Sequence, residues 1–529
     1  MKFLIKFAVI FLTIYSPINC KSVHGPYRED DESRMHPNLP ATDRSFLKNP
    51  KEETNEYWEE IGQEFVEQQI NRKLNLNTAK NIILFMGDGM SIATVSAARV
   101  YSGGEEQQLE FEKSTYTGSS KTYCVNYQVA DSACSATAYL TGVKGNMGTI
   151  GVNGQVKERE CRAAMDPKKQ TESIASWAMK AGKDAGLVTT TRVTHASPAG
   201  VFAHIADRDW ENNVAIEEAN CDSSLDDDIT EQLVHGHIGK QLKVILGGGR
   251  GVFTNTTDKD PETQQGGWRT DGKNLINEWL ENEKNLNSKY VWNRTDLMNI
   301  DAKTTDRLLG LFDPSHCQYN LDIKDKNMKE EPSLSEMVDK AIDILSKNEK
   351  GFFLFVEGGR IDHGHHGTQA RYALDETVEF SKAYKLARDR LSESDTLIVV
   401  TADHAHTMSY AGYPNRGNDI FGTAGSGSND KLPYMTLSYA NGPGFDVHVT
   451  KEANGRVDVR KLDTKRSDFK FPTTVPLDSE THGGEDVAIY ASGPFAHLFS
   501  GTIEQNVIPH TMAYAACIGD GITKCGQKK

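Results

Sequence analysis

Long apolar runs and clusters of positive charge are both scarce in this chain of 529 residues. The apolar N-terminal run FLIKFAVIFLTIYS is too short to span a membrane, and no later run reaches that length, so no transmembrane segment is expected. The formal net charge is -15 and no basic stretch occurs, which argues against nucleic acid as a specific ligand. A small anionic substrate would need local positive charge from metal ions or from a few arginines.

Cysteine is scarce as well, with eight residues. Residues 1–20, which end at Cys20, have the short charged start and apolar stretch of a secretory signal peptide. In an oxidising compartment the other seven cysteines can form disulfides, but one must stay free or pair between chains. Glycosylation sequons at Asn255 and Asn293 fit a secreted protein. The chain ends in CGQKK without an apolar tail, so we expect a soluble secreted protein without a GPI anchor.

Residues 21–50 are polar and proline-rich, which predicts a flexible leader. The next segment places Trp58, Ile61, Phe65 and Ile70 at roughly helical spacing. This spacing predicts an amphipathic helix near the surface or against a partner.

Short apolar runs then alternate with helical patterns, as in NIILFMG, AGLVTTT and DTLIVVTAD. The alternation predicts an α/β fold with a central, mostly parallel sheet flanked by helices on both faces. At residues 411–474 glycine-rich loops and alternating strands replace this rhythm. We therefore expect a small β-rich insertion there, within an α/β domain made of residues 51–410 and 475–529.

Ser132, in the segment DSACSATAYL, is the candidate nucleophile. A serine hydroxyl is almost wholly protonated at neutral pH, so a base or a metal must activate it. No GxSxG turn surrounds Ser132, which argues against a hydrolase triad and favours metal activation. The segment also has the pattern of a helix start, in which Ser132 would serve as the N-cap. Both roles are compatible, because a helix N-terminus favours an anionic oxygen.

Four carboxylates lie at predicted strand ends or in a histidine-rich segment, namely Asp88, Glu357, Asp362 and Asp403. Ligands of open α/β sheets bind at the carboxyl ends of strands, so these groups are expected to meet. Together they would repel one another unless multivalent cations neutralised them. One cluster such as HGHH would more simply be a solvated loop, but four clusters favour a metal site.

The ligand types indicate which metals would bind. Mixed imidazole and carboxylate ligands suit zinc, whereas an all-oxygen set suits magnesium. The candidate zinc ligands are Asp362, His366 and His482 for one ion and Asp88, Asp403 and His404 for a second, and the candidate magnesium ligands are Asp88, Ser197 and Glu357. His406 would contact a ligand or the substrate. Two metals about 4 Å apart suit an in-line phosphoryl transfer through a phosphoserine.

A phosphate group also needs donors for its free oxygens, and the planar fork of an arginine fits this task better than lysine. Arg208 is the candidate, although an ion pair with Asp207 or Asp209 would explain it equally well. The glycine clusters GDG, GGG and GG do not continue as a nucleotide fingerprint, so we interpret them as strand-end turns.

At these residues the chain resembles the alkaline phosphatases of animals. Its anchors are DSACSATAYLTGVKG, TRVTHASPAG, VEGGRIDHGHH, TADHAH and ETHGGEDV, within a match from about residue 54 to the end. The resemblance implies hydrolysis of small phosphate monoesters with two zinc ions and one magnesium ion. It also implies the division of ligands among these three ions, His195 in the outer shell of magnesium, and Arg208 on the phosphate.

Further expectations come from the resemblance alone. A peripheral calcium site would match Glu262, the Phe312 carbonyl, Asp313 and Glu331. Disulfides would join Cys161 to Cys221 and Cys517 to Cys525, while Cys124, Cys134 and Cys317 stay unassigned. The N-terminal helix of the family embraces a second subunit, which implies a homodimer, and the insertion would be the family's exposed crown-like part.

The chain departs from the family pattern at two positions. Ser91 replaces the glycine usual after GDGM, and Gly483 replaces an alanine after His482. We expect both changes to tune the pocket without removing a ligand.

Two other functions remain open. A phosphodiesterase or nucleotide pyrophosphatase of the same fold usually has a threonine nucleophile and no magnesium-type set, so Ser132, Ser197 and Arg208 favour monoesters. An inactive secreted protein that captures phosphorylated ligands would keep the fold. The intact nucleophile and ligands argue against that alternative.

Overall fold

The computed structural model describes residues 49–282, 284–450 and 455–526. The predicted signal peptide and residues 21–48 of the predicted leader lie outside the described residues. The described part begins with the 3-10 helix η2 (Pro50–Glu53) and the helix α2 (Asn55–Ile70), which Thr54 caps. This confirms the predicted helix. None of its residues is buried, and the side chains of Trp58, Phe65 and Ile70 are 56%, 59% and 76% exposed.

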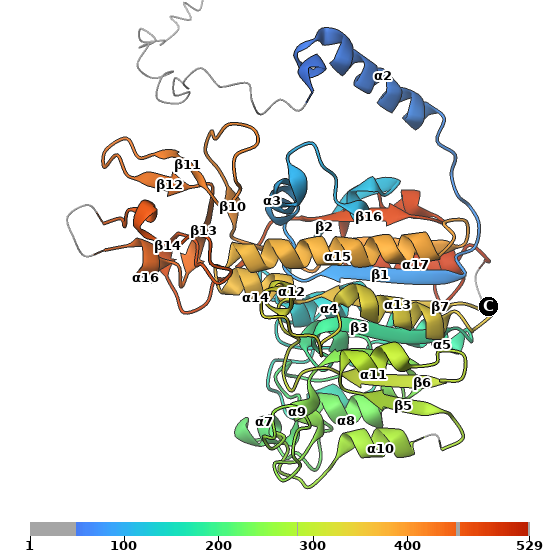
Figure 1. The fold of residues 1–529 in the computed structure, drawn as a ribbon. Coiled ribbons are helices and arrows are strands. Elements are labelled where there is room, and N and C mark those ends of the chain that lie inside the picture. Colours follow the sequence, from blue (N-terminus) through green and yellow to red (C-terminus); the bar gives the residue numbers. More distant parts are fainter. Residues whose placement is uncertain (1–48, 283, 451–454, 527–529) are drawn as a thin grey trace, which may run out of the picture. The chain divides into compact units, whose positions relative to one another are not determined.

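A ten-stranded sheet forms the centre of the fold, in the order β17-β2-β16-β8-β1-β7-β3-β4-β6-β5. Its strands are β1 (Asn81–Gly87), β2 (Tyr116–Lys121), β3 (Asp184–Arg192), β4 (Val244–Gly248), β5 (Ser288–Val291), β6 (Arg307–Leu311), β7 (Phe352–Gly358), β8 (Thr396–Ala402), β16 (Val487–Ser492) and β17 (Gly501–Glu504). Within this sheet, only β16 runs antiparallel to its neighbours. Figure 1 shows the strands from β2 and β16 near its top to β5 near its bottom. The predicted mostly parallel sheet is thus confirmed.

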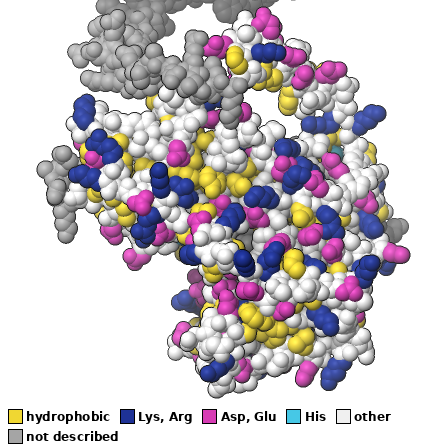
Figure 2. Space-filling model, in the orientation of Figure 1, with side chains coloured by type: hydrophobic (Ala, Val, Ile, Leu, Met, Phe, Trp, Pro, Cys, Tyr) yellow, Lys and Arg dark blue, Asp and Glu magenta, His cyan; other side chains and the backbone are white. Residues whose placement is uncertain are grey.

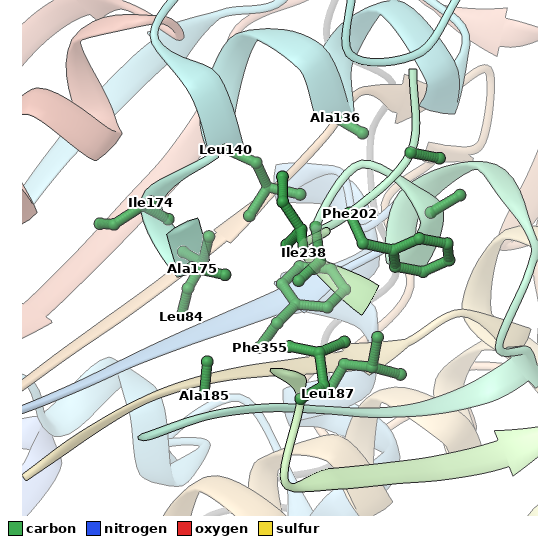
Figure 3. Close-up of a cluster of buried hydrophobic side chains, with 14 of the residues drawn as sticks. Leu84, Ala136, Leu140, Ile174, Ala175, Ala185, Leu187, Phe202, Ile238 and Phe355 are labelled. Atoms are coloured by element: carbon green, nitrogen blue, oxygen red, sulfur yellow. The ribbon is translucent and has the colours of Figure 1, made fainter. Parts of the chain in front are cut away.

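The central strands are buried on both faces, which explains their continuous apolar sequences. Every residue of β1, β7 and β8 is buried. Successive side chains point to opposite faces, so Leu84 joins one core and Ile83 and Phe85 join the other. In Figure 3, Leu84 lies with Phe355 and other apolar side chains of the first core.

Helices cover both faces of the sheet. One face packs against α3 (Ile92–Gly103), α13 (Leu334–Leu345) and α15 (Ala370–Arg390), and the other against α4 (Ser132–Thr141), α5 (Ile174–Lys180), α6 (Ala196–Ala199) and α17 (Val507–Ala516). The remaining helices are α7 (Asn213–Glu218), α8 (Ile229–Val234), α9 (Arg250–Phe253), α10 (Leu275–Glu281), α11 (Arg294–Asn299), α12 (Asn320–Asp325), α14 (Arg360–His366) and α16 (Phe445–His448). The start of α13 is determined by its local sequence, because Ser333 and Glu336 form a reciprocal capping box there.

Smaller sheets lie outside the central one. The strands β10 (Ser409–Tyr410), β13 (Leu437–Gly442) and β14 (Thr473–Pro476) form a three-stranded sheet, and β11 (Thr423–Ser426) pairs with β12 (Pro433–Met435). They lie at the left of Figure 1. A further pair, β9 (Ala405–His406) with β15 (His482–Gly483), joins two of the histidine motifs.

Three disulfides link the described cysteines. Cys161–Cys221 and Cys517–Cys525 form as the resemblance implied, and Cys124–Cys134 is a third bond that the sequence left unassigned. Cys317 is free and buried.

The surface bears on three of the sequence predictions. Both sequon asparagines, Asn255 and Asn293, are only 7% exposed, so neither side chain is presented for glycosylation in this conformation. Figure 2 shows basic and acidic side chains interspersed on the face it displays. No described helix combines the length and apolar character that crossing a membrane requires.

Candidate active site

Three adjacent strands bring carboxylates to one edge of the sheet. Asp88 follows β1 directly, Asp403 follows β8 directly, and Glu357 lies at the end of β7. Strand β1 pairs with β7 on one side and with β8 on the other. All three side chains are 0% exposed. The order of the strands therefore brings these three carboxylates together, as expected.

Ser132 lies beside this edge as the first residue of α4. Its Oγ is 3.4 Å from Asp88 Oδ2 and 3.3 Å from His404 Nε2. The alternative role of Ser132 as the helix N-cap is wrong, because Asp131 caps α4 by accepting a hydrogen bond from the Cys134 N–H at 3.1 Å. The serine hydroxyl is consequently left free of a structural task and lies at the positive end of a helix.

Asp362, His366 and His482 come together as predicted. Asp362 and His366 lie on α14 and His482 on β15, and their ligand atoms are 3.1 to 3.4 Å apart. A tetrahedral zinc ion with bonds of about 2.0–2.1 Å separates its ligands by about 3.3 Å. The three side chains therefore fit a zinc ion.

Asp88, Asp403 and His404 form a second group of the same kind. His404 Nε2 lies 3.1 Å from Asp403 Oδ2 and 3.5 Å from Asp88 Oδ1. All three residues are fully buried. Their spacing suits one cation directly beside the Ser132 hydroxyl.

The third predicted group consists of Asp88, Ser197 and Glu357. Among the described residues, Ser197 Oγ and Glu357 Oε1 are buried without a hydrogen-bond partner. The other oxygen of Glu357 accepts hydrogen bonds from Thr189 and Thr191 at the end of β3. Sequence reasoning missed these two threonines. Buried oxygens without donors fit a hard cation such as magnesium.

The electrostatics of the edge also fit cations. Burial, and then the charges of its carboxylate neighbours, raises the pKa of Asp88 well above its ordinary value. Burial raises the pKa of Asp403 and brings that of Glu357 to about 7. Burial alone would raise the pKa of Asp362 too, but the neighbouring His366 and His406 hold it well below its usual range. Burial lowers the pKa of His404 well below its ordinary value, which leaves a neutral imidazole able to bind a metal.

His406 contacts a predicted ligand. Its Nε2 lies 2.7 Å from Asp362 Oδ1, and its Nδ1 bonds to Glu480. Burial lowers the pKa of His406, but these two carboxylates outweigh it and raise the pKa to about 10. The glycine at position 89 has a φ of +69° and leaves room for the His406 ring, since a Cβ there would lie 2.4 Å from it. Glu480 is a further residue that sequence reasoning missed.

Arg208 points into the same region. Its Nη1 donates to Asp131 Oδ2 at 3.0 Å, and its Nη2 lies 3.2 Å from His195 Nε2. The alternative ion pair with Asp207 is not formed, because Arg159 occupies that carboxylate. Among the described residues, Asp209 does not bind Arg208 either. Asp131, which anchors the arginine, is the partner that sequence reasoning missed.

The four residues of the predicted calcium site are only partly gathered. Gln318 bridges two of them, donating its side-chain N–H to Asp313 Oδ2 and its backbone N–H to Glu331 Oε1, both at 2.8 Å. Burial raises the pKa of Glu331 to about 8, and Asp313 and Glu262 add to this. Glu262, however, binds the Arg250 guanidinium at 2.5 Å. The Phe312 backbone N–H bonds to Gly247 in β4.

The two departures from the family pattern have local explanations. Ser91 caps α3 by accepting a hydrogen bond from Thr94 N–H at 3.0 Å. At Gly483 a Cβ would lie 2.4 Å from Glu485 Oε2 and 2.9 Å from the His406 carbonyl oxygen, so glycine suits the close pairing of β15 with β9. Neither residue replaces a predicted ligand.

Comparison with known proteins identifies the family of this chain. Residues 79–518 match the sequence profile of the alkaline phosphatase family. The chain is 46% identical to the membrane-bound alkaline phosphatase of Bombyx mori, over 93% of this chain and 91% of that protein. It is 46% identical to the tissue-nonspecific alkaline phosphatase of Homo sapiens, over 90% of this chain and 91% of that protein.

Solved structures show the same fold. The alkaline phosphatase of Thermus thermophilus has a TM-score of 0.58 at 22% identity and covers 90% of this chain and 95% of its own. That of the Antarctic bacterium TAB5 has a TM-score of 0.57 at 22% identity and covers 83% of this chain and 99% of its own. The chain belongs to the alkaline phosphatase family, and it is a metal-dependent enzyme that hydrolyses phosphate monoesters.

Proposed function

We propose that Ser132 is the nucleophile of a two-step hydrolysis of phosphate monoesters. The single observation that carries this assignment is the position of the Ser132 hydroxyl, which starts α4 without capping it and lies within 3.3 to 3.5 Å of Asp88 and His404. A hydroxyl in this place is deprotonated more easily than in water, because the helix N-terminus and a cation both favour its anion.

The three ligand groups divide among three ions in this proposal. Two zinc ions would be held by Asp362, His366 and His482 and by Asp88, Asp403 and His404, and one magnesium ion by Asp88, Ser197 and Glu357. Support comes from ligand atoms 3.1 to 3.5 Å apart in the zinc groups and from buried oxygens without donors in the magnesium group. When bound, these cations would neutralise the carboxylates, lower the pKa of the serine hydroxyl and stabilise charge on the reacting oxygens.

The protein groups account for the order of events. Arg208 binds the free oxygens of the phosphate, and Asp131 keeps its guanidinium in place. Ser132 Oγ loses its proton and attacks phosphorus, the ester P–O bond breaks, and the alcohol leaves. Water then attacks the phosphoserine from the opposite side, which releases inorganic phosphate and returns the serine hydroxyl. Two inversions at phosphorus give net retention.

His195 and His406 act through other groups in this proposal. His195 lies beside both Arg208 and the carboxylates of Asp88 and Glu357, so it orients the arginine and the outer shell of the magnesium ion. His406 donates to Asp362 and fixes the carboxylate oxygen that faces His482.

Three further features belong to the same proposal. The exposed apolar side chains of α2 support a homodimer in which this helix packs on a second copy of the chain. The three disulfides support an oxidising, extracellular compartment. The Asp313 and Glu331 carboxylates support a calcium site, with Glu262 turning from Arg250 to the ion and the Phe312 carbonyl as a further ligand.

Substitution of Ser132 by alanine tests the central assignment. We expect turnover of p-nitrophenyl phosphate to fall by on the order of 10⁴-fold or more, with inorganic phosphate still bound. Turnover of the S132A variant within a few fold of the parent enzyme would overturn the assignment. A bis-ester measured beside the monoester distinguishes a phosphodiesterase, which would cleave the bis-ester faster.

A further inference from the structure

The Cys124–Cys134 disulfide closes a small ring around the candidate nucleophile. Cys134 lies in the first turn of α4, two residues after Ser132, and Cys124 precedes the loop that leads into this helix. The two Cα atoms are 5.8 Å apart, and the cysteines are separated by 10 positions in the sequence. Ser132 therefore belongs to a covalent ring of which the disulfide is the closing bond.

Three consecutive residues of this ring contact the site. The Ala130 carbonyl accepts a hydrogen bond from His482 Nδ1 at 2.7 Å, which leaves Nε2 of that histidine facing Asp362. Asp131 holds Arg208 at 3.0 Å through one oxygen and caps α4 through the other. Ser132 follows directly. A shift of this backbone would move a zinc ligand, the phosphate-binding arginine and the nucleophile together.

Little else anchors the rest of the ring. The loop has no helix or strand between Thr122 and Asp131, and the side chains of Val125 and Tyr127 are 55% and 56% exposed. Its buried apolar anchor is a small cluster made of Cys124, Cys134 and Ala130, which Met147 covers. Removing the disulfide would therefore remove two of the three buried members of this cluster and the covalent closure at once.

Hydrogen bonds also tie the loop to its surroundings. The loop is tied to the segment after α4 by Val125 N–H to the Gly145 carbonyl at 3.0 Å and by Met147 N–H to Asn126 Oδ1 at 2.9 Å. Both involve residues well before Ala130 in the loop. Beside the nucleophile, Gly148 N–H donates to Asp131 Oδ1 at 3.2 Å, and the disulfide adds a covalent link to the same part of the chain.

We infer that the Cys124–Cys134 disulfide is a positioning element of the reaction, which keeps Ala130, Asp131 and Ser132 in register with His482 and Arg208. Cys124 and Cys134 are positioning residues and touch no substrate. The inference rests on the proposed roles of Ser132, His482 and Arg208. Misplacement by about 1 Å at a reacting group lowers rates by on the order of 100-fold, so loosening this ring should affect turnover more than stability.

The double variant C124A/C134A tests this inference, with C517A/C525A as the matched control. The control removes a disulfide of similar span, with a separation of 8 positions, from the end of the chain. Both variants are assayed with p-nitrophenyl phosphate well below their melting temperatures. The measurements are kcat, KM, inhibition by inorganic phosphate, and the burst of p-nitrophenol in the first turnover.

We expect C124A/C134A to lose about tenfold to 100-fold in kcat, with a slower burst and weaker inhibition by phosphate, while C517A/C525A stays within twofold of the parent. A folded C124A/C134A enzyme with the parent's kcat, burst rate and phosphate inhibition would overturn the inference. Equal losses in the two double variants would also overturn it, since a general loss of rigidity would then suffice.

A second measurement covers the case in which the double variant does not fold. The parent enzyme is treated with a phosphine, which reduces a disulfide to two thiols and takes oxygen from water to become the phosphine oxide. Alkylation and mass spectrometry then report which disulfide has opened at each time point. Activity should fall in step with opening of Cys124–Cys134, and full activity after that bond has opened would contradict the inference. The S132A variant separates the two outcomes. An active S132A enzyme would overturn the proposed function, and this inference with it, whereas an inactive S132A enzyme beside a fully active C124A/C134A enzyme would overturn this inference alone.

Discussion

Two clusters of carboxylates in this protein are stabilised in different ways. In the first, Arg269 lies at 0% exposure between the buried Asp228 and the exposed Asp271, with Nη2 at 2.8 Å and 2.6 Å from their carboxylates. In the second, at the ends of β1, β7 and β8, the neighbouring Arg208 bonds to Asp131 and His195, outside the group. The first cluster contains its own counterion, and the second does not.

Burial raises carboxylate pKa values in both clusters, but the consequence differs. Burial raises the pKa of Asp228 to about 7, while the hydrogen bond and charge of Arg269 act in the opposite direction. For Asp88, burial and the charges of three other carboxylates raise the pKa well above its ordinary value, and the charge of Arg208 offsets this only in part. A buried acid cluster that lacks a protein cation is thus the better candidate for a metal centre, whereas one built around an arginine is a structural element.

Removal of metal ions tests this difference between the two clusters, and it should have the largest effect on activity. Treatment with a strong chelator should lower turnover by on the order of 1,000-fold, since cations supply several kcal/mol of transition-state stabilisation. Zinc and magnesium together should restore it. Metal analysis of the purified enzyme should give about two zinc ions and one magnesium ion per chain. Full turnover after complete removal of the metal ions would mean that both carboxylate clusters have only a structural role.

Removal of the internal counterion should affect stability instead. The substitution Arg269→Met leaves the buried Asp228 carboxylate without its cationic partner, and we expect the free energy of unfolding to fall by about 3–5 kcal/mol. Denaturant unfolding measures this change. The kcat of the folded variant should equal that of the parent enzyme. Arg466→Met, which removes an exposed pair with Asp468, is the control and should change stability little.

Substitution of Arg208 by lysine tests whether this arginine, beside the cluster at the ends of β1, β7 and β8, binds the phosphate. A lysine keeps the charge but loses the planar fork, so kcat/KM should fall by about 100-fold while the free energy of unfolding changes little. Arg159→Lys is the matched control, because Arg159 binds the neighbouring Asp207 from the solvent side. Equal kcat/KM values for the two variants would contradict the proposed role.

The smallest effect is expected from Thr191→Val. This change removes one hydrogen bond to the proposed ligand Glu357, at 3.1 Å, and replaces no ligand residue. Outer-shell partners of this kind contribute about tenfold or more to metal affinity, so activity should need about tenfold more magnesium. Thr377→Val, whose hydroxyl bonds only within α15, provides the control for loss of a buried hydroxyl. Unchanged magnesium dependence would mean that Thr191 has only a structural role.

Much of the fold could be predicted because the signals are local. NIILFMG and DTLIVVTAD are continuous apolar runs of strand length, and both became central strands. Strands such as β5 and β17 were missed, since their short sequences SKYV and GTIE carry no distinctive pattern. The acid and histidine residues proposed as ligands stood out in the sequence because such residue types are rare at strand ends unless they have a function. Asp131, Thr189 and Glu480 were missed because each supports a ligand or Arg208 through a contact that no spacing reveals.

The sequence by itself determined the alternation of strands and helices and the kinds of atoms available for metals and substrate, because both follow from neighbouring residues. Only the tertiary structure decided which of these atoms meet. Asp131 and Arg208 are 77 positions apart, and Ala130 and His482 are 352 apart. The pairing of Cys124 with Cys134, close in sequence, was equally open until the loop and α4 were in place. Packing of the sheet fixes such distances, and no local pattern encodes them.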